Sequence, residues 1–162
     1  MKATTSSLSL AVVVRPEWGQ AASLRNVVAA LVKAASGDAE AAANAGMVAC
    51  ELAENAIKYG DWSNGGGFDF RLTVDGHEAS VEVISPYDAA SGSFERLGAI
   101  LRAIEERSAN DAYLARLAEV AEKSGETGRL GLLRIAHEVG ARITAEIVDG
   151  TSCVRAKWRA GR

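Results

Sequence analysis

Two polar residues, Glu51 and Asn55, stand one helical turn apart in a run that has no helix breaker before Gly60. At about 100° per residue they lie along one side of a helix face whose middle is apolar, with Val48 and Leu52. Burying a carboxylate or a carboxamide without a partner costs roughly 2–7 kcal/mol, so packing alone explains this placement poorly. The spacing therefore indicates a candidate site. A helix that carries two polar residues at its edge is the alternative that this run leaves open.

The helix that must position this pair is predicted from about Asp38 to Tyr59, with Asp38 as its N-cap and Gly60 as its stop. The run from Glu51 to Gly60 resembles the N-box helix of the GHKL superfamily, which includes gyrase, heat-shock and histidine-kinase type ATPases. It is most similar to the anti-sigma-factor serine kinases, which have a Glu, three residues, an Asn and an Ala–apolar–basic–aromatic–Gly ending. The resemblance implies that Glu51 is catalytic, polarising a water or hydroxyl for attack on the γ-phosphate, and that Asn55 binds Mg²⁺.

The adenine contact of that family would fall at Ser85. In the family a strand is followed by an Asp-x-Gly-x-Gly box, whose Asp accepts a hydrogen bond from the adenine amino group. Here Ser85 takes the place of the Asp and Tyr87 that of the first Gly. A neutral hydroxyl replaces a carboxylate at Ser85, so ATP and Mg²⁺ are the implied cofactors but their binding is predicted to be weak or absent.

The phosphate contacts of the family would come from a second box, Gly-x-Gly-Leu-Gly-Leu, at the start of a helix. Leu130-Gly131-Leu132 matches the end of this box, whereas Thr127 and Arg129 replace its earlier glycines and Gly128 is out of step. The resemblance makes Gly128, Arg129 and Gly131 candidate phosphate contacts, because backbone N–H groups at a helix start favour anions. Arg129 either contacts a phosphate or fills its space. A plain helix start after a glycine-containing loop remains the alternative.

Hydrophobic periodicity predicts the element order β-α-α-β-β-α-α-α-β-β. This order indicates one α/β (α+β) domain over residues 1–162, a two-layer sandwich. Its mixed, mostly antiparallel sheet of about five strands would be covered by helices on one face, which is also the GHKL layout. A helical, lid-like insertion is expected at about 88–124. The strands are predicted near 7–14, 68–74, 78–84, 142–148 and 152–158, and the helices near 20–35, 38–59, 94–104, 113–120 and 130–139. Asp75-Gly76 and Asp149-Gly150 are predicted to be tight hairpin turns. Glu54 and Lys58 are expected to form an i,i+4 pair on the solvated side of their helix.

Composition excludes several classes of protein. A net charge of −3 argues against nucleic-acid binding, and the sequence has no apolar run long enough to span a membrane. Two cysteines, Cys50 and Cys153, give neither a disulfide framework nor a metal-ligand spacing, as expected for a cytoplasmic protein.

The resemblance implies an intracellular regulatory switch protein that binds a partner, either anti-sigma-factor antagonist-like or sigma-factor-like, and it leaves a homodimer open. In an enzymatic version Asn55 holds Mg²⁺ of bound ATP and Glu51 orients a Ser or Thr hydroxyl of the partner. In a non-enzymatic version the site has decayed and the fold is a binding module. A branch of bacterial partner-switching kinases linked to biofilm control is similar in its helical lid and altered first box. A metabolic enzyme of unrelated fold would need a cluster of catalytic side chains, which the sequence does not show.

Overall fold

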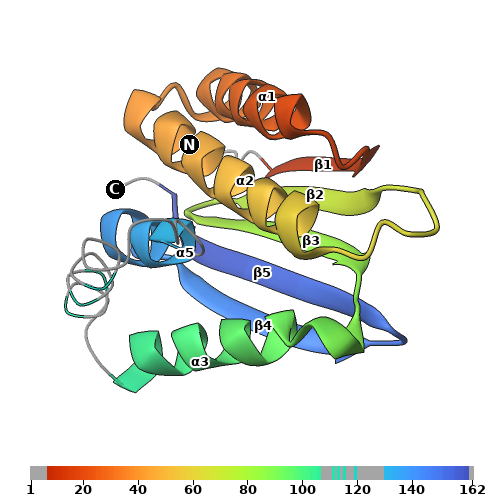
Figure 1. Ribbon diagram of the computed structural model, residues 1–162. Coiled ribbons are helices and arrows are strands. Elements are labelled where there is room, and N and C mark those ends of the chain that lie inside the picture. Colours follow the sequence, from red (N-terminus) through yellow and green to blue (C-terminus); the bar gives the residue numbers. More distant parts are fainter. Residues whose placement is uncertain are drawn as a thin grey trace.

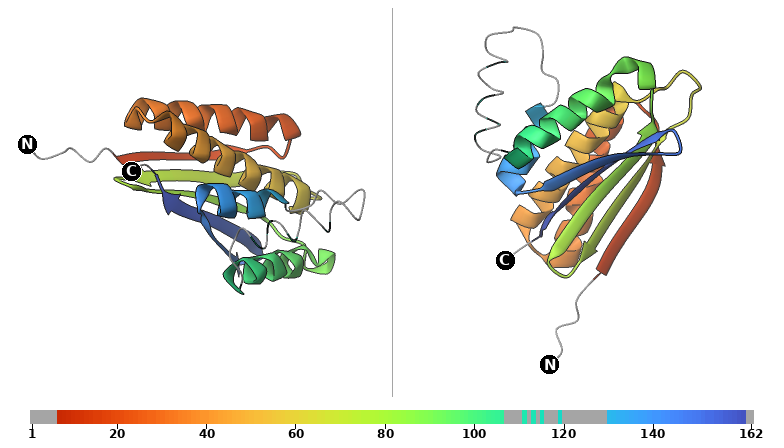
Figure 2. Two further views of the ribbon diagram at one scale, coloured as in Figure 1. Left: turned by 90° about the vertical axis from the view of Figure 1, so that its left-hand side faces the viewer. Right: turned by 90° about the horizontal axis from the view of Figure 1, so that it is seen from below.

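The fold is a five-stranded sheet with helices packed on one of its faces (Figures 1 and 2). This arrangement confirms the expected two-layer sandwich. The computed structural model describes residues 7–106, 111, 113, 115, 119 and 130–160. The elements are β1 (Ser7–Val14), α1 (Trp18–Ser36), α2 (Ala39–Tyr59), β2 (Phe68–Asp75), β3 (Glu78–Pro86), a 3₁₀ turn (Ala89–Ser91), α3 (Ser93–Glu106), α5 (Leu130–Arg134), a π-helical turn (Ile135–Val139), β4 (Arg142–Val148) and β5 (Thr151–Arg159).

The strands are arranged in the order β1-β2-β3-β5-β4, and every neighbouring pair is antiparallel. Two hairpins, β2–β3 and β4–β5, therefore meet in the middle of the sheet. Asp149 and Gly150 join β4 to β5 with positive φ at both residues, as a tight hairpin turn of this kind requires. The sequence placed the other turn at Asp75-Gly76, but Asp75 still pairs with Glu78 and the turn is one residue later.

Alternating side chains give the sheet a buried face and an open face. The register aligns one row of apolar residues under the helices: Leu10, Leu72, Val81, Ala156 and Ile143. All but Leu10 are buried, and Leu10, on the edge strand, packs against this core. The alternation predicted from the sequence is confirmed in β2, where Phe68, Phe70, Leu72 and Val74 are buried.

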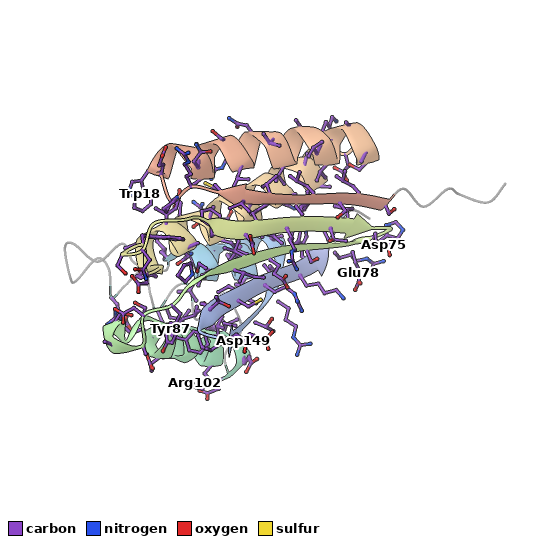
Figure 3. All side chains as sticks on the ribbon, turned by 90° about the vertical axis from the view of Figure 1, so that its right-hand side faces the viewer. Trp18, Asp75, Glu78, Tyr87, Arg102 and Asp149 are labelled. Atoms are coloured by element: carbon purple, nitrogen blue, oxygen red, sulfur yellow. The ribbon has the colours of Figure 1, made fainter. Side chains whose placement is uncertain are left out.

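The open face carries charged side chains. Glu82 of β3 forms ion pairs with Arg71 of β2, at 3.3 Å, and with Arg155 of β5, so one carboxylate joins the two hairpins. Figure 3 shows Asp75 and Glu78 toward one end of the sheet, and Trp18, Tyr87 and Asp149 toward the other.

Helix α2 is the central element of the helical layer. Its N-cap is confirmed: Asp38 Oδ1 accepts hydrogen bonds from the backbone N–H groups of Glu40 (2.8 Å) and Ala41 (3.1 Å). The helix stops at Gly60, as predicted, but this glycine has an extended backbone (φ −69°, ψ 154°) rather than a left-handed one. Glycine is needed there because a β-carbon would lie 2.5 Å from the indole of Trp62.

We expect Asp38→Ala to destabilise the protein by about 1 kcal/mol, the usual effect of losing an N-cap carboxylate. Asp75→Ala is the matched control, since Asp75 is exposed and its substitution should change stability by less than about 0.5 kcal/mol. Urea denaturation followed by circular dichroism measures both. Equal midpoints for the two variants would show that the cap contributes little.

The other predicted boundaries are close to those observed. Helix α1 begins two residues before the predicted position and ends one residue after it, and the predicted helix at 130–139 divides into α5 and the π-helical turn. The predicted lid-like helix at 113–120 lies largely outside the described residues. Of that stretch the described residues 113, 115 and 119 are helical.

Candidate functional site

A pocket opens between α2, the end of β3 and α3. It offers about 50 Å³ to the centres of water molecules, which is room for a few waters. Most of its wall is apolar, with a small number of hydroxyl and amide groups. The lining residues are Leu52, Asn55, Ala56, Tyr59, Gly60, Val83, Ser85, Pro86, Tyr87, Ser93, Phe94, Leu97, Leu132, Ser152 and Val154.

The end of β3 forms one wall of this pocket. Ser85 is 8% exposed and lines the pocket. It occupies the position at which the family resemblance implies an adenine-binding Asp. The ring of Tyr87 packs edge-on against Phe94 of α3, with 5.7 Å between the ring centroids. An aromatic pair therefore lines the pocket at the position where the first glycine box of the family would leave backbone exposed.

Asn55 of α2 is one of the residues that line the pocket. Its Nδ2 donates a hydrogen bond to the backbone oxygen of Glu51, at 2.7 Å. This bond fixes the orientation of the amide. In the described part of the chain, the Oδ1 atom of Asn55 accepts no hydrogen bond, so it can still act as an oxygen ligand.

Glu51 does not line the pocket. The residue is 7% exposed, and its Oε1 accepts a hydrogen bond from Nη2 of Arg134, with which it forms an ion pair. Its Oε2 lies against Gly131, where a β-carbon would collide with the carboxylate. The two residues that sequence spacing placed together are thus neighbours on α2 with different surroundings.

The electrostatics of Glu51 are dominated by its burial. Loss of solvent raises the pKa of this carboxyl above its usual value, and the guanidinium of Arg134 opposes that shift. The ion pair uses Nη2 of Arg134, whereas the buried Nε atom has no hydrogen-bond partner among the described residues. Arg134 therefore neutralises the carboxylate without satisfying all of its own donors.

The structure describes only part of the second candidate glycine box. Gly131 is in α5 and contacts Glu51, whereas Gly128 and Arg129 lie outside the described residues. Sequence analysis missed Arg134. A signal for it existed, because Arg134 follows Gly131 by three residues and residues at this spacing lie on the same side of a helix.

No cluster of His, Cys, Asp or Glu within the described ranges is large enough to hold a metal ion by itself. Asn55 would have to share any Mg²⁺ with phosphate oxygens and waters. Of the helices that the structure describes, none is long and apolar enough to cross a membrane.

Comparison with known proteins gives a match at the level of fold. No protein-family model matches the sequence, and no curated protein matches it. The fold is similar to that of a chain in the crystal structure of the SiaB–SiaC complex from Pseudomonas aeruginosa, with a TM-score of 0.65 and 18% sequence identity. The likeness covers 92% of this chain and 88% of that chain. At this identity it establishes the architecture.

Proposed function

We propose that this chain is an intracellular regulatory protein that works by binding a partner protein, on a GHKL-type fold. The observation that carries the proposal is the likeness, over 92% of the chain, to a protein solved in complex with another protein. The N-box-like run of α2 supports the same assignment, since Glu51 and Asn55 keep the family's spacing. We propose as partner a single-domain protein of the anti-sigma-factor antagonist type, with a sigma-factor-like protein as the second choice.

The described residues fit Mg·ATP only in part. Asn55 is in the pocket wall, and its side-chain oxygen accepts no hydrogen bond from a described residue, so it could serve as a ligand of a metal ion. The adenine end fits poorly, because Ser85 provides a hydroxyl instead of a carboxylate and the pocket has room for no more than a few water molecules. Glu51 is also engaged by Arg134. This combination favours a binding module over a nucleotide-dependent enzyme.

A Mg·ATP-dependent serine/threonine kinase is the second candidate function. It is favoured by one observation: Asn55 lines the pocket, and its side-chain oxygen accepts no hydrogen bond from a described residue. In this version Asn55 would hold Mg²⁺, Ser85, Gly128, Arg129 and Gly131 would contact the nucleotide, and Glu51 would orient the hydroxyl of the partner.

Partner binding is tested with purified proteins. The chain is mixed with a single-domain antagonist-like protein from the same genome, and in a second arm with a sigma-factor-like protein, and each mixture is run on a size-exclusion column. We expect co-elution with the antagonist-like protein. Separate elution in both arms, confirmed by the absence of heat on titration, would contradict the proposal.

Nucleotide binding is predicted to be weak or absent. Losing about 3 kcal/mol of adenine recognition raises a micromolar dissociation constant by roughly a hundredfold. The measurement is calorimetric titration with ATP and Mg²⁺, with Asn55→Ala as the control variant. Micromolar binding that the Asn55→Ala substitution abolishes would make the kinase the leading function. No heat with either protein would support the partner-binding module.

A further inference from the structure

The ion pair of Glu51 and Arg134 connects two elements that are far apart in the chain. Its residues are separated by 83 positions, and they join α2 to α5. Glu51 is almost completely enclosed, whereas the side chain of Arg134 is 36% exposed. Solvent therefore reaches the pair only from the arginine side.

Arg134 belongs to a segment with unusual backbone geometry. Helix α5 has five residues and passes directly into a π-helical turn, Ile135–Val139. Short π-helical turns are frequent at functional sites. The element that holds the guanidinium is thus a short one, next to the long and regular helix α2.

The contact between the two side chains is incomplete. An arginine side chain can bind a carboxylate through two parallel hydrogen bonds, but here a single Nη2–Oε1 hydrogen bond is formed and the buried Nε atom is left without a described partner. The other carboxylate oxygen lies against Gly131, where only glycine leaves it room. A contact that leaves a buried donor unpaired is less favourable than a fully paired one, so it is easier to open.

We propose that Arg134 is a positioning residue that withdraws the Glu51 carboxylate from the pocket, so that the ion pair acts as a latch between α2 and α5. In the closed state seen here Asn55 lines the pocket and Glu51 does not. Movement of the guanidinium away from Glu51 frees the carboxylate to turn toward Asn55. The inference rests on the proposed function only in taking Glu51 as the carboxylate of the regulated site.

The test measures the accessibility of Glu51 in the full-length protein. Carboxylates are labelled with a water-soluble carbodiimide and glycinamide, and the rate at each residue is read by peptide mass spectrometry. Glu95 is the internal reference, because it is exposed on α3 and forms no ion pair with a described residue. In the native sequence we expect Glu51 to react at least about tenfold more slowly than Glu95, equivalent to 1.4 kcal/mol.

Two different substitutions should open the latch. Arg134→Ala removes the guanidinium, and Gly131→Ala displaces the carboxylate while Arg134 remains. Each is expected to raise the labelling rate of Glu51 toward that of Glu95, and Arg134→Lys should preserve part of the protection. Gly98→Ala, a glycine substitution in α3, is the matched control and should leave Glu51 protected. Among the described residues its β-carbon would meet Arg102 alone, at 3.4 Å, outside the helix's own backbone.

Two results would overturn the latch. The first is that Glu51 stays protected from labelling in both Arg134→Ala and Gly131→Ala while these variants are folded, because packing and not the ion pair would then enclose the carboxylate. The other is a Glu51 that reacts as fast as Glu95 in the native sequence. If circular dichroism shows that Arg134→Ala does not fold, the labelling rates of Glu51 in Gly131→Ala and Arg134→Lys decide whether the latch exists. The labelling uses the protein alone, so failure of partner or nucleotide binding leaves the result unaffected and is recognised separately.

Discussion

Leu52→Asp is expected to unfold the protein. Leu52 is 1% exposed and lies on the face of α2 that packs into the hydrophobic core. An unpaired charge buried there should consume most or all of a typical stability margin of about 5–15 kcal/mol. Circular dichroism in the absence of denaturant, followed by urea denaturation, measures the loss.

Glu54→Ala is the control on the same helix. Glu54 is half-buried, and its Oε1 accepts a weak hydrogen bond from Sγ of Cys50 at 3.4 Å. We expect its removal to change the free energy of unfolding by less than about 1 kcal/mol. Similar denaturation midpoints for Leu52→Asp and Glu54→Ala would contradict the assignment of the buried face.

Arg134→Ala is expected to lower stability at neutral pH by at most about 3–5 kcal/mol, the cost of a Glu51 carboxylate that stays buried without its partner. Release of the carboxylate toward solvent, as the latch requires, makes the loss smaller. The loss should depend on pH. Burial raises the pKa of Glu51, Arg134 and Arg25 lower it and Glu54 raises it, so that the net direction is upward. Without Arg134 the pKa of a Glu51 carboxyl that stays buried rises further.

The sign of the pH effect follows from proton binding. A Glu with a raised pKa holds its proton more tightly in the folded state than in the unfolded state. The contribution of this group to stability is therefore most favourable below the unfolded-state pKa and is lost as the pH rises through the folded-state value. Arg134→Ala should thus be closest to the native protein in acid and least stable above the raised pKa of Glu51.

The double variant Glu51→Gln, Arg134→Ala separates charge from packing. It removes the buried charge together with its partner, so it should be more stable than Arg134→Ala at neutral pH and should lack the pH dependence. Urea denaturation at several pH values tests this. An equal loss in both variants at every pH would assign the effect to packing of the arginine side chain.

Local sequence signals predicted most of the fold. Alternation of apolar residues identified β2, and Asp149-Gly150 identified the last hairpin, because each pattern depends on backbone and burial preferences within a few residues. Asp38 could be recognised as an N-cap for the same reason.

Contacts between distant segments could not be predicted in this way. The partner of Glu51 lies 83 residues away along the chain. One local prediction was also wrong, because other groups contact the same side chains. Spacing favoured an ion pair between Glu54 and Lys58, but the ammonium of Lys58 lies 5.3 Å from the ring centroid of Tyr59 and Glu54 contacts Cys50.

The junction of the two hairpins has consequences for the order of folding steps and for the length of the chain that connects the hairpins. Each hairpin closes through a two-residue turn, which can form within microseconds. Pairing of β3 with β5 must instead bring together strands that are separated by the chain between Pro86 and Arg142, so we expect it to be among the later steps. The entropy of closing that loop grows slowly, by about 0.6 kcal/mol for each doubling of its length. A change in the length of the chain that joins α3 to α5 therefore costs little loop entropy, whereas α3 and α5 themselves contribute buried residues to the core.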